Sequence, residues 1–97
     1  MRISDMQRQE IKKYAGIIFG ASAKVYLFGS RADDTKRGGD IDLFIDCDQE
    51  YNSFTHKIDF LAKLYGAFGE QKIDVVIKQK NDTRLVTQEA LTKGILL

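Results

Sequence analysis

The chain of 97 residues is long enough for one domain with a modest apolar core, and we predict a single domain over residues 1–97. Its 15 basic and 14 acidic residues almost cancel, so the composition favours neither direct nucleic-acid binding nor membrane binding. One cysteine rules out an internal disulfide, and no apolar run approaches the roughly 20 residues that cross a bilayer, so we expect a cytoplasmic protein.

A helix is predicted from Ser4 to about Gly20. Ser4 is followed three residues later by Gln7, which is the spacing of a capping box, and Gly20 is a typical stop residue. Apolar residues recur at spacings of three and four and form one stripe that should face the core: Ile11, Tyr14, Ala15, Ile18 and Phe19.

A strand is predicted over residues 24–28, which are mostly β-branched or aromatic. Gly29 and Ser30 end this strand. A glycine lets a phosphate approach the backbone closely, and a serine can donate its hydroxyl to it. Ser30 and Asp33 repeat the capping-box spacing, so we expect a short helix to begin here and to direct its amide groups toward a phosphate.

A second strand is predicted over residues 40–46, where polar and apolar residues alternate. Three apolar residues share one face: Ile41, Leu43 and Ile45. Asp40 and Asp42 share the opposite face, where two like charges beside apolar neighbours are costly unless a cation lies between them. A divalent metal ion is the candidate for that cation, and a solvated polar strand face is the alternative.

Two further helices are predicted. The first runs from Asn52 or Ser53 to Phe68, before Gly69, with a core stripe of Phe54, Ile58, Leu61, Tyr65 and Phe68. The second covers residues 83–93 and is capped by Asp82, with three residues directed inward: Leu85, Val86 and Leu91.

A third strand is predicted over residues 72–78, with Asp74 on its polar face, and residues 95–97 form an apolar tail that packs on the domain or on a partner. The expected order is helix-strand-helix-strand-helix-strand-helix, an α/β (α+β) fold. Only about eleven residues join the first two strands, which favours an antiparallel pair, whereas a full helix joins the second and third and permits a parallel pair. A three-stranded mixed sheet with the second strand in the centre satisfies both conditions.

This topology brings the polar groups together at one end of the sheet. The Gly29-Ser30 loop follows the first strand, Asp40 and Asp42 begin the second, and Asp74 lies near the start of the third. Three carboxylates facing a phosphate-accepting loop match what phosphoryl transfer requires, with two magnesium ions about 3.5–4 Å apart. We expect Asp40 and Asp42 to bridge the ions and Asp74 to hold the ion next to the nucleophile.

At these residues the sequence resembles the minimal nucleotidyltransferases (MNT domains) of the DNA-polymerase-β-like superfamily. Their signature is a hydrophobic residue before Gly-Ser, a spacer of about ten residues, and Asp-hydrophobic-Asp-hydrophobic. Here the signature stands as Phe28–Arg31 and Asp40–Leu43, with the third carboxylate in Ile73–Val76. Residues 89–97 are similar to the usual end of small family members, and Gly38-Gly39 departs from the serine that many relatives have there.

The resemblance implies a nucleotidyltransferase fold that transfers a nucleoside monophosphate with magnesium, most often AMP from ATP. It assigns catalytic and metal-binding roles to Asp40, Asp42 and Asp74, and nucleotide or phosphate binding to Gly29, Ser30 and, more weakly, Arg31. Relatives of this size are commonly encoded beside a helical HEPN protein. In such type VII-like pairs the MntA-type antitoxin adenylylates a tyrosine of the HEPN toxin, so a toxin partner is expected, in a hetero-oligomer or a dimer.

Two other functions are compatible with the sequence. A non-catalytic antitoxin could neutralise its partner by covering it, which the small size and the apolar tail would suit. Alternatively, a small molecule could accept the nucleotide, although one short domain leaves little room for a separate acceptor site.

Overall fold

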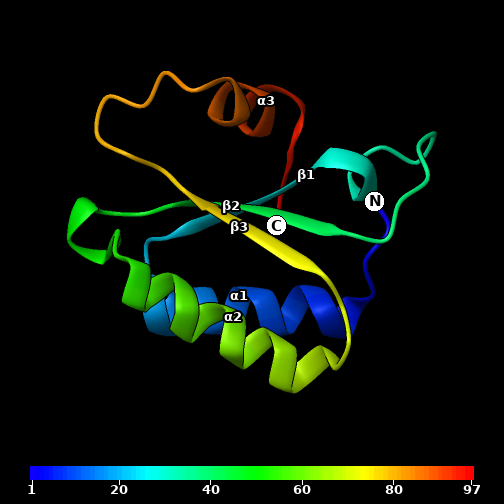
Figure 1. The fold of residues 1–97 in the computed structure, drawn as a ribbon, viewed down its shortest axis with the longest axis horizontal. Coiled ribbons are helices and arrows are strands. Elements are labelled where there is room, and N and C mark those ends of the chain that lie inside the picture. Colours follow the sequence, from blue (N-terminus) through cyan, green and yellow to red (C-terminus); the bar gives the residue numbers. More distant parts are fainter.

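Three helices flank a four-stranded sheet in the computed structural model, which describes all 97 residues (Figure 1). In chain order the elements are α1 (Asp5–Phe19), β1 (Lys24–Phe28), the 3₁₀ turn η1 (Gly29–Arg31), β2 (Ile41–Asp46), the 3₁₀ turn η2 (Gln49–Tyr51), α2 (Phe54–Phe68), β3 (Ile73–Ile77), α3 (Leu85–Lys93) and β4 (Ile95–Leu96). The α/β (α+β) fold class predicted from the sequence is therefore confirmed, although the second predicted helix is only the 3₁₀ turn η1 and a fourth strand ends the chain. No helix combines the length with the apolar character that a bilayer-spanning segment needs.

The sheet has the strand order β3-β2-β1-β4. As predicted, β2 lies between β1, with which it pairs antiparallel, and β3, with which it pairs parallel. The prediction of three strands is wrong, because the apolar tail adds β4 beside β1, with Leu96 opposite Tyr26 and Ile95 opposite Leu27. A strand of two residues is too short to show alternation in the sequence, so only the pairing reveals it.

The two faces of the sheet are covered unequally. Helices α1 and α2 lie on one face, and α3 lies on the other (Figure 1). The main core fills the first interface, with buried residues from both helices, from β1, β2 and β3, and from the chain end: Ile11, Ala15, Phe19, Val25, Leu27, Ile41, Leu43, Ile45, Phe60, Leu64, Ile73, Val75, Ile77 and Leu97. Under α3 only a small cluster is buried, formed by Phe28, Phe44 and Ala90. Polar groups can therefore stand beside α3 without interrupting the main core.

Helix α1 follows its prediction, whereas α2 turns a different face inward. Ser4 and Gln7 form the expected capping box. In α2 the predicted stripe is wrong in part: Leu61 and Phe68 pack against the core, but Phe54 is 76% exposed. The fully buried residues of this helix are Phe60 and Leu64. The α2 sequence carries two apolar stripes, and the contact of Phe60 with Phe19 of α1, at 5.3 Å between ring centroids, fixes which of them faces the core.

Helix α3 also differs from its prediction. It begins at Leu85 instead of Thr83, and Asp82 does not cap it but pairs with Arg84 at 2.7 Å. Leu85 is 81% exposed, and the buried positions are Thr87 and Ala90. Of the residues predicted inward, Val86 packs against the cluster under α3, whereas Leu85 and Leu91 are exposed. Because α3 rests on two phenylalanine rings, its contact face needs small side chains.

Candidate functional site

A row of paired residues crosses three strands at one end of the sheet. Phe28 of β1 stands opposite Asp42 of β2, and Asp42 stands opposite Asp74 of β3. Residues paired across strands point to the same face, which here is the α3 side. Gly29 directly follows Phe28. The Gly-Ser loop therefore lies at the same end of the sheet as Asp42 and Asp74, as predicted.

The Asp42 carboxylate packs directly against Gly29. Gly29 has a φ of +72°, and a Cβ at this position would collide with the carboxylate. Burial raises the pKa of Asp42 above its ordinary value, and the charges of Asp74, Asp40 and Glu89 raise it further. Asp42 is thus a half-buried carboxylate among like charges, which is the environment that a cation would stabilise.

The other two predicted carboxylates are more accessible. Asp74 is exposed on β3. Asp40 lies one residue before β2 begins, so the predicted start of this strand is one residue too early, and its carboxylate pairs with Lys72 Nζ at 3.3 Å. Hydrogen bonding to Asp40 raises the pKa of Lys72, as do the charges of Asp40, Asp74 and Asp42. Lys72 is therefore a cation in direct contact with Asp40 and close enough to interact with the charges of Asp42 and Asp74.

The Gly-Ser loop is a single 3₁₀ turn rather than the expected short helix. No side chain caps η1, and the predicted Ser30–Asp33 capping box is absent. Asp33 instead accepts hydrogen bonds from the backbone and hydroxyl of Thr35. The Ser30 hydroxyl lies against Gly38, where a Cβ would collide with it. A side chain at position 38 would therefore displace the Ser30 hydroxyl, whereas Gly39 has open space around it.

Arg31, assigned to phosphate binding by resemblance, bonds three other segments. Its guanidinium donates to the carbonyl of Arg2 at 2.7 Å, to the carbonyl of Gly39 at 2.8 Å and to Gln71 Oε1 at 3.3 Å. These bonds tie the N-terminal segment, the loop before β2 and the loop before β3 to η1. Arg31 therefore stabilises the loops that surround the carboxylates.

A polar cavity of about 320 Å³ opens beside Gly29. It lies between η1, the loop that follows η1, and α3, and it is lined by Gly29, Ala32, Asp33, Asp34, Lys36, Glu89 and Lys93. Neither α3 residue was predicted for the site. No local pattern marks them, because their position depends on how α3 packs across the sheet. Lys72 was missed as well, although its spacing of two from Asp74 places both residues on one strand face.

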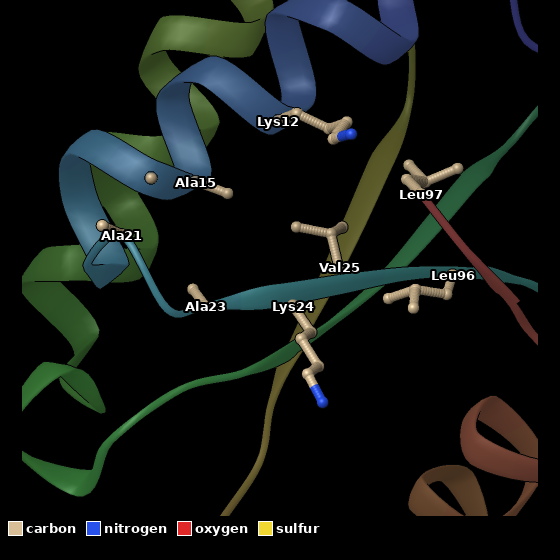
Figure 2. Close-up of a pocket in the computed structure, with 9 residues that line it drawn as sticks. Lys12, Ala15, Ala21, Ala23, Lys24, Val25, Leu96 and Leu97 are labelled. Carbon is tan, nitrogen blue, oxygen red and sulfur yellow. The ribbon is translucent and has the colours of Figure 1, made fainter.

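The largest cavity of the protein lies elsewhere. It measures about 330 Å³ and is mostly apolar. Figure 2 shows its walls, with Lys12 and Ala15 on α1 and with Val25, Leu96 and Leu97 on the strands β1 and β4 and the chain end. None of the carboxylates or the Gly-Ser loop residues lines it, so it is separate from the candidate site.

Comparison with known families agrees with this geometry. Residues 9–97 match the model of the family described as polymerase beta, nucleotidyltransferase. The chain belongs to this nucleotidyltransferase family. A comparison with curated protein sequences gave no significant match. The matched segment spans every strand of the sheet and all of the carboxylates described above.

Nucleotidyltransferase domains generally use nucleotide substrates and Mg²⁺. The structure has no group of three His, Cys, Asp or Glu side chains in metal-binding geometry. The donor chemistry nevertheless fits the ion, because Asp42 and Asp74 are register-paired carboxylates and magnesium prefers oxygen ligands with remaining positions held by water or phosphate. Asp40 is the third oxygen donor nearby and is paired with Lys72.

Removing the positive charge of Lys72 should strengthen metal binding by this nucleotidyltransferase. In Lys72→Met the three carboxylates lose their neighbouring cation, so we expect Mn²⁺ or Mg²⁺ to bind roughly threefold more tightly. Calorimetric titration of the full chain measures this directly. Lys80→Met, which removes an exposed lysine with no ion pair, is the control, and weaker metal binding by Lys72→Met would contradict the prediction.

Proposed function

We propose that this nucleotidyltransferase transfers AMP from ATP to a tyrosine of a HEPN-type toxin, and that it acts as the antitoxin of the pair. The observation that carries the transfer activity is the alignment of Asp42 and Asp74 on adjacent strands beside Gly29. The family match supports nucleotidyl transfer, while the toxin as acceptor rests on the resemblance of the chain to MNT antitoxins.

The proposed metal ligands are Asp42, Asp74 and Asp40. Bound Mg²⁺ would neutralise the phosphate charge and activate the attacking oxygen. The protein itself contributes the shape of the site. Gly29 leaves room for the Asp42 carboxylate to pack against the backbone, and the half-buried position of Asp42 excludes part of the water that would otherwise weaken its interactions.

The acceptor would approach from the side of Asp74. Because Asp74 is exposed, a tyrosine on a folded partner can reach it. The phenolic oxygen forms a bond to the α-phosphorus, the bond from that phosphorus to the bridging oxygen breaks, and pyrophosphate leaves. Asp74 would accept the phenolic proton, so the net products are AMP-tyrosine, pyrophosphate and one proton.

Neutralisation by binding alone was suggested by two features, the small size and the apolar tail, and the second no longer supports it. The apolar tail was the proposed contact with a toxin, but Ile95 and Leu96 pair with β1, and Leu97 is buried in the core. Only Leu96 keeps an exposed side chain, at 54%. The tail is thus a structural part of the sheet, and we favour the catalytic function.

The proposal is tested by incubating the full chain with Mg-ATP and the protein encoded next to it. We expect the neighbour to gain the mass of one or more AMP groups, located on tyrosine by peptide mass spectrometry. Asp42→Asn should give no mass gain. If wild type binds ATP but transfers nothing, the proposed transfer is wrong. If Asp42→Asn still neutralises the toxin fully in cells, binding alone is sufficient.

A further inference from the structure

We infer that helix α3 forms part of the nucleotide site, with Lys93 acting together with Lys36 to bind the distal phosphates of the nucleoside triphosphate. This inference rests on the proposed function and extends it to residues that neither the sequence motif nor the family match singles out. The two lysines come from distant segments, since Lys36 follows η1 and Lys93 is in the last turn of α3.

The first support is position. Lys36, Lys93 and Gly29 line the same cavity of about 320 Å³, and Gly29 is the residue against which the Asp42 carboxylate packs. A phosphate chain that enters beside Gly29 therefore has the reactive carboxylates at one end and the cavity at the other. A volume of this size is at the lower end of the range for small-ligand sites.

The second support is the charge of the cavity wall. Two of its three carboxylates already have partners, because Asp33 accepts two hydrogen bonds from Thr35 and Asp34 pairs with the amino group of Met1 at 2.6 Å. Neither Lys36 nor Lys93 forms an ion pair within 4.0 Å. The cavity thus offers two ammonium groups to an anion, and lysine is a regular phosphate ligand in proteins.

The third support is that the cavity wall carries groups of both signs. Glu89 lies one turn before Lys93 on α3, and it lines the same cavity as Lys36 and Lys93. A magnesium–triphosphate complex also combines a cation with anionic phosphates, so a wall of this composition suits it.

A purely structural role for Lys93 is the competing explanation, because a lysine in the last turn of a helix stabilises the helix dipole. The two roles predict different results. A structural lysine affects thermal stability and leaves ligand affinity unchanged. A phosphate ligand affects the affinity for polyphosphates and leaves the affinity for a nucleoside monophosphate almost unchanged.

The test is calorimetric titration of the full chain, with Mg²⁺ present, against ATP, inorganic tripolyphosphate and AMP. For Lys93→Gln and Lys36→Gln we expect roughly tenfold weaker binding of ATP and of tripolyphosphate and little change for AMP. Lys93→Arg should retain most of the binding. Lys63→Gln is the matched control, since it removes an exposed lysine from α2 on the opposite face of the sheet.

The outcomes separate this inference from the proposed function. If Lys93→Gln binds ATP and tripolyphosphate like wild type while wild type transfers AMP, α3 has no part in phosphate binding and the transfer proposal stands. If wild type binds neither ATP nor tripolyphosphate, both are wrong. A third outcome is that Lys93→Gln has a lower melting temperature, while both Lys93→Gln and Lys93→Arg bind ATP and tripolyphosphate with wild-type affinity. In that case Lys93 only stabilises the helix dipole, and the inference fails.

Discussion

Replacing Asp42 with asparagine is expected to abolish nucleotidyl transfer and, without metal present, to raise the melting temperature by a few degrees. Transfer is lost because the substitution removes the charge of the carboxylate that lies between Phe28 and Asp74 in the register. Stability rises because the ionised Asp42 is half-buried and lies near Asp74, Asp40 and Glu89. An active site that costs stability in this way is common among enzymes.

The gain in stability should depend on pH in a defined direction. The pKa of Asp42 is raised in the folded protein, so the folded state binds this proton more tightly than the unfolded state does. The stability that protonated Asp42 contributes is fully present below its ordinary pKa of 3.8 and is lost as the pH rises through the raised value. The melting-temperature difference between Asp42→Asn and wild type should therefore be small in acid and grow toward neutral pH.

The control for this prediction is Asp46→Asn on the same face of β2. Asp46 lies at the other end of the strand and pairs with Lys78 at 3.6 Å, so its substitution should leave transfer intact and give no gain in stability. Thermal melts from pH 4 to pH 8 measure both variants. A lower melting temperature for Asp42→Asn than for wild type at pH 8 would show that Asp42 is stabilised, not strained, in the folded protein.

Replacing Gly29 with alanine should damage both stability and activity. The residue has a φ of +72°, which an L-amino acid adopts only at a cost, and the new Cβ would collide with the Asp42 carboxylate. We expect the free energy of unfolding to fall by about 1–3 kcal/mol. Transfer should fall by about 100-fold or more, because Asp42 must move from its position.

Gly66→Ala is the matched control for the glycine substitution. Gly66 lies within α2 with open space around its Cα, so alanine there should raise stability by about 0.5–1 kcal/mol without affecting transfer. Denaturant unfolding and a transfer assay on both variants make the comparison. If Gly29→Ala retains wild-type transfer, close packing between Gly29 and Asp42 is not required for catalysis.

Much of the candidate site could be predicted because it depends on strand alternation and on connection lengths. The alternation along residues 40–46 placed Asp42 opposite the core face, and the two connection lengths placed β2 between an antiparallel and a parallel neighbour. Both features are confirmed by the observed register. Local patterns of this kind are read directly from the sequence, because backbone geometry imposes them.

The features that were missed or wrong depend on how distant segments pack. The stripe that α2 buries is chosen by contact with Phe19, and the small residues that α3 buries are chosen by the rings of Phe28 and Phe44. Glu89 and Lys93 reach the site only because α3 crosses this part of the sheet. The sequence alone does not distinguish two roles for Arg31, since a basic residue after Gly-Ser can bind a phosphate or bridge neighbouring loops. In the structure its guanidinium donates hydrogen bonds to the loops.

The alternation of β2 also links the site to the global stability of the protein. Ile41, Leu43 and Ile45 are completely buried in the main core, while Asp42, between them in sequence, belongs to the site. Both edges of this strand are bonded to neighbouring strands. Asp42 is therefore held by a strand that should open only when the whole cooperative unit unfolds.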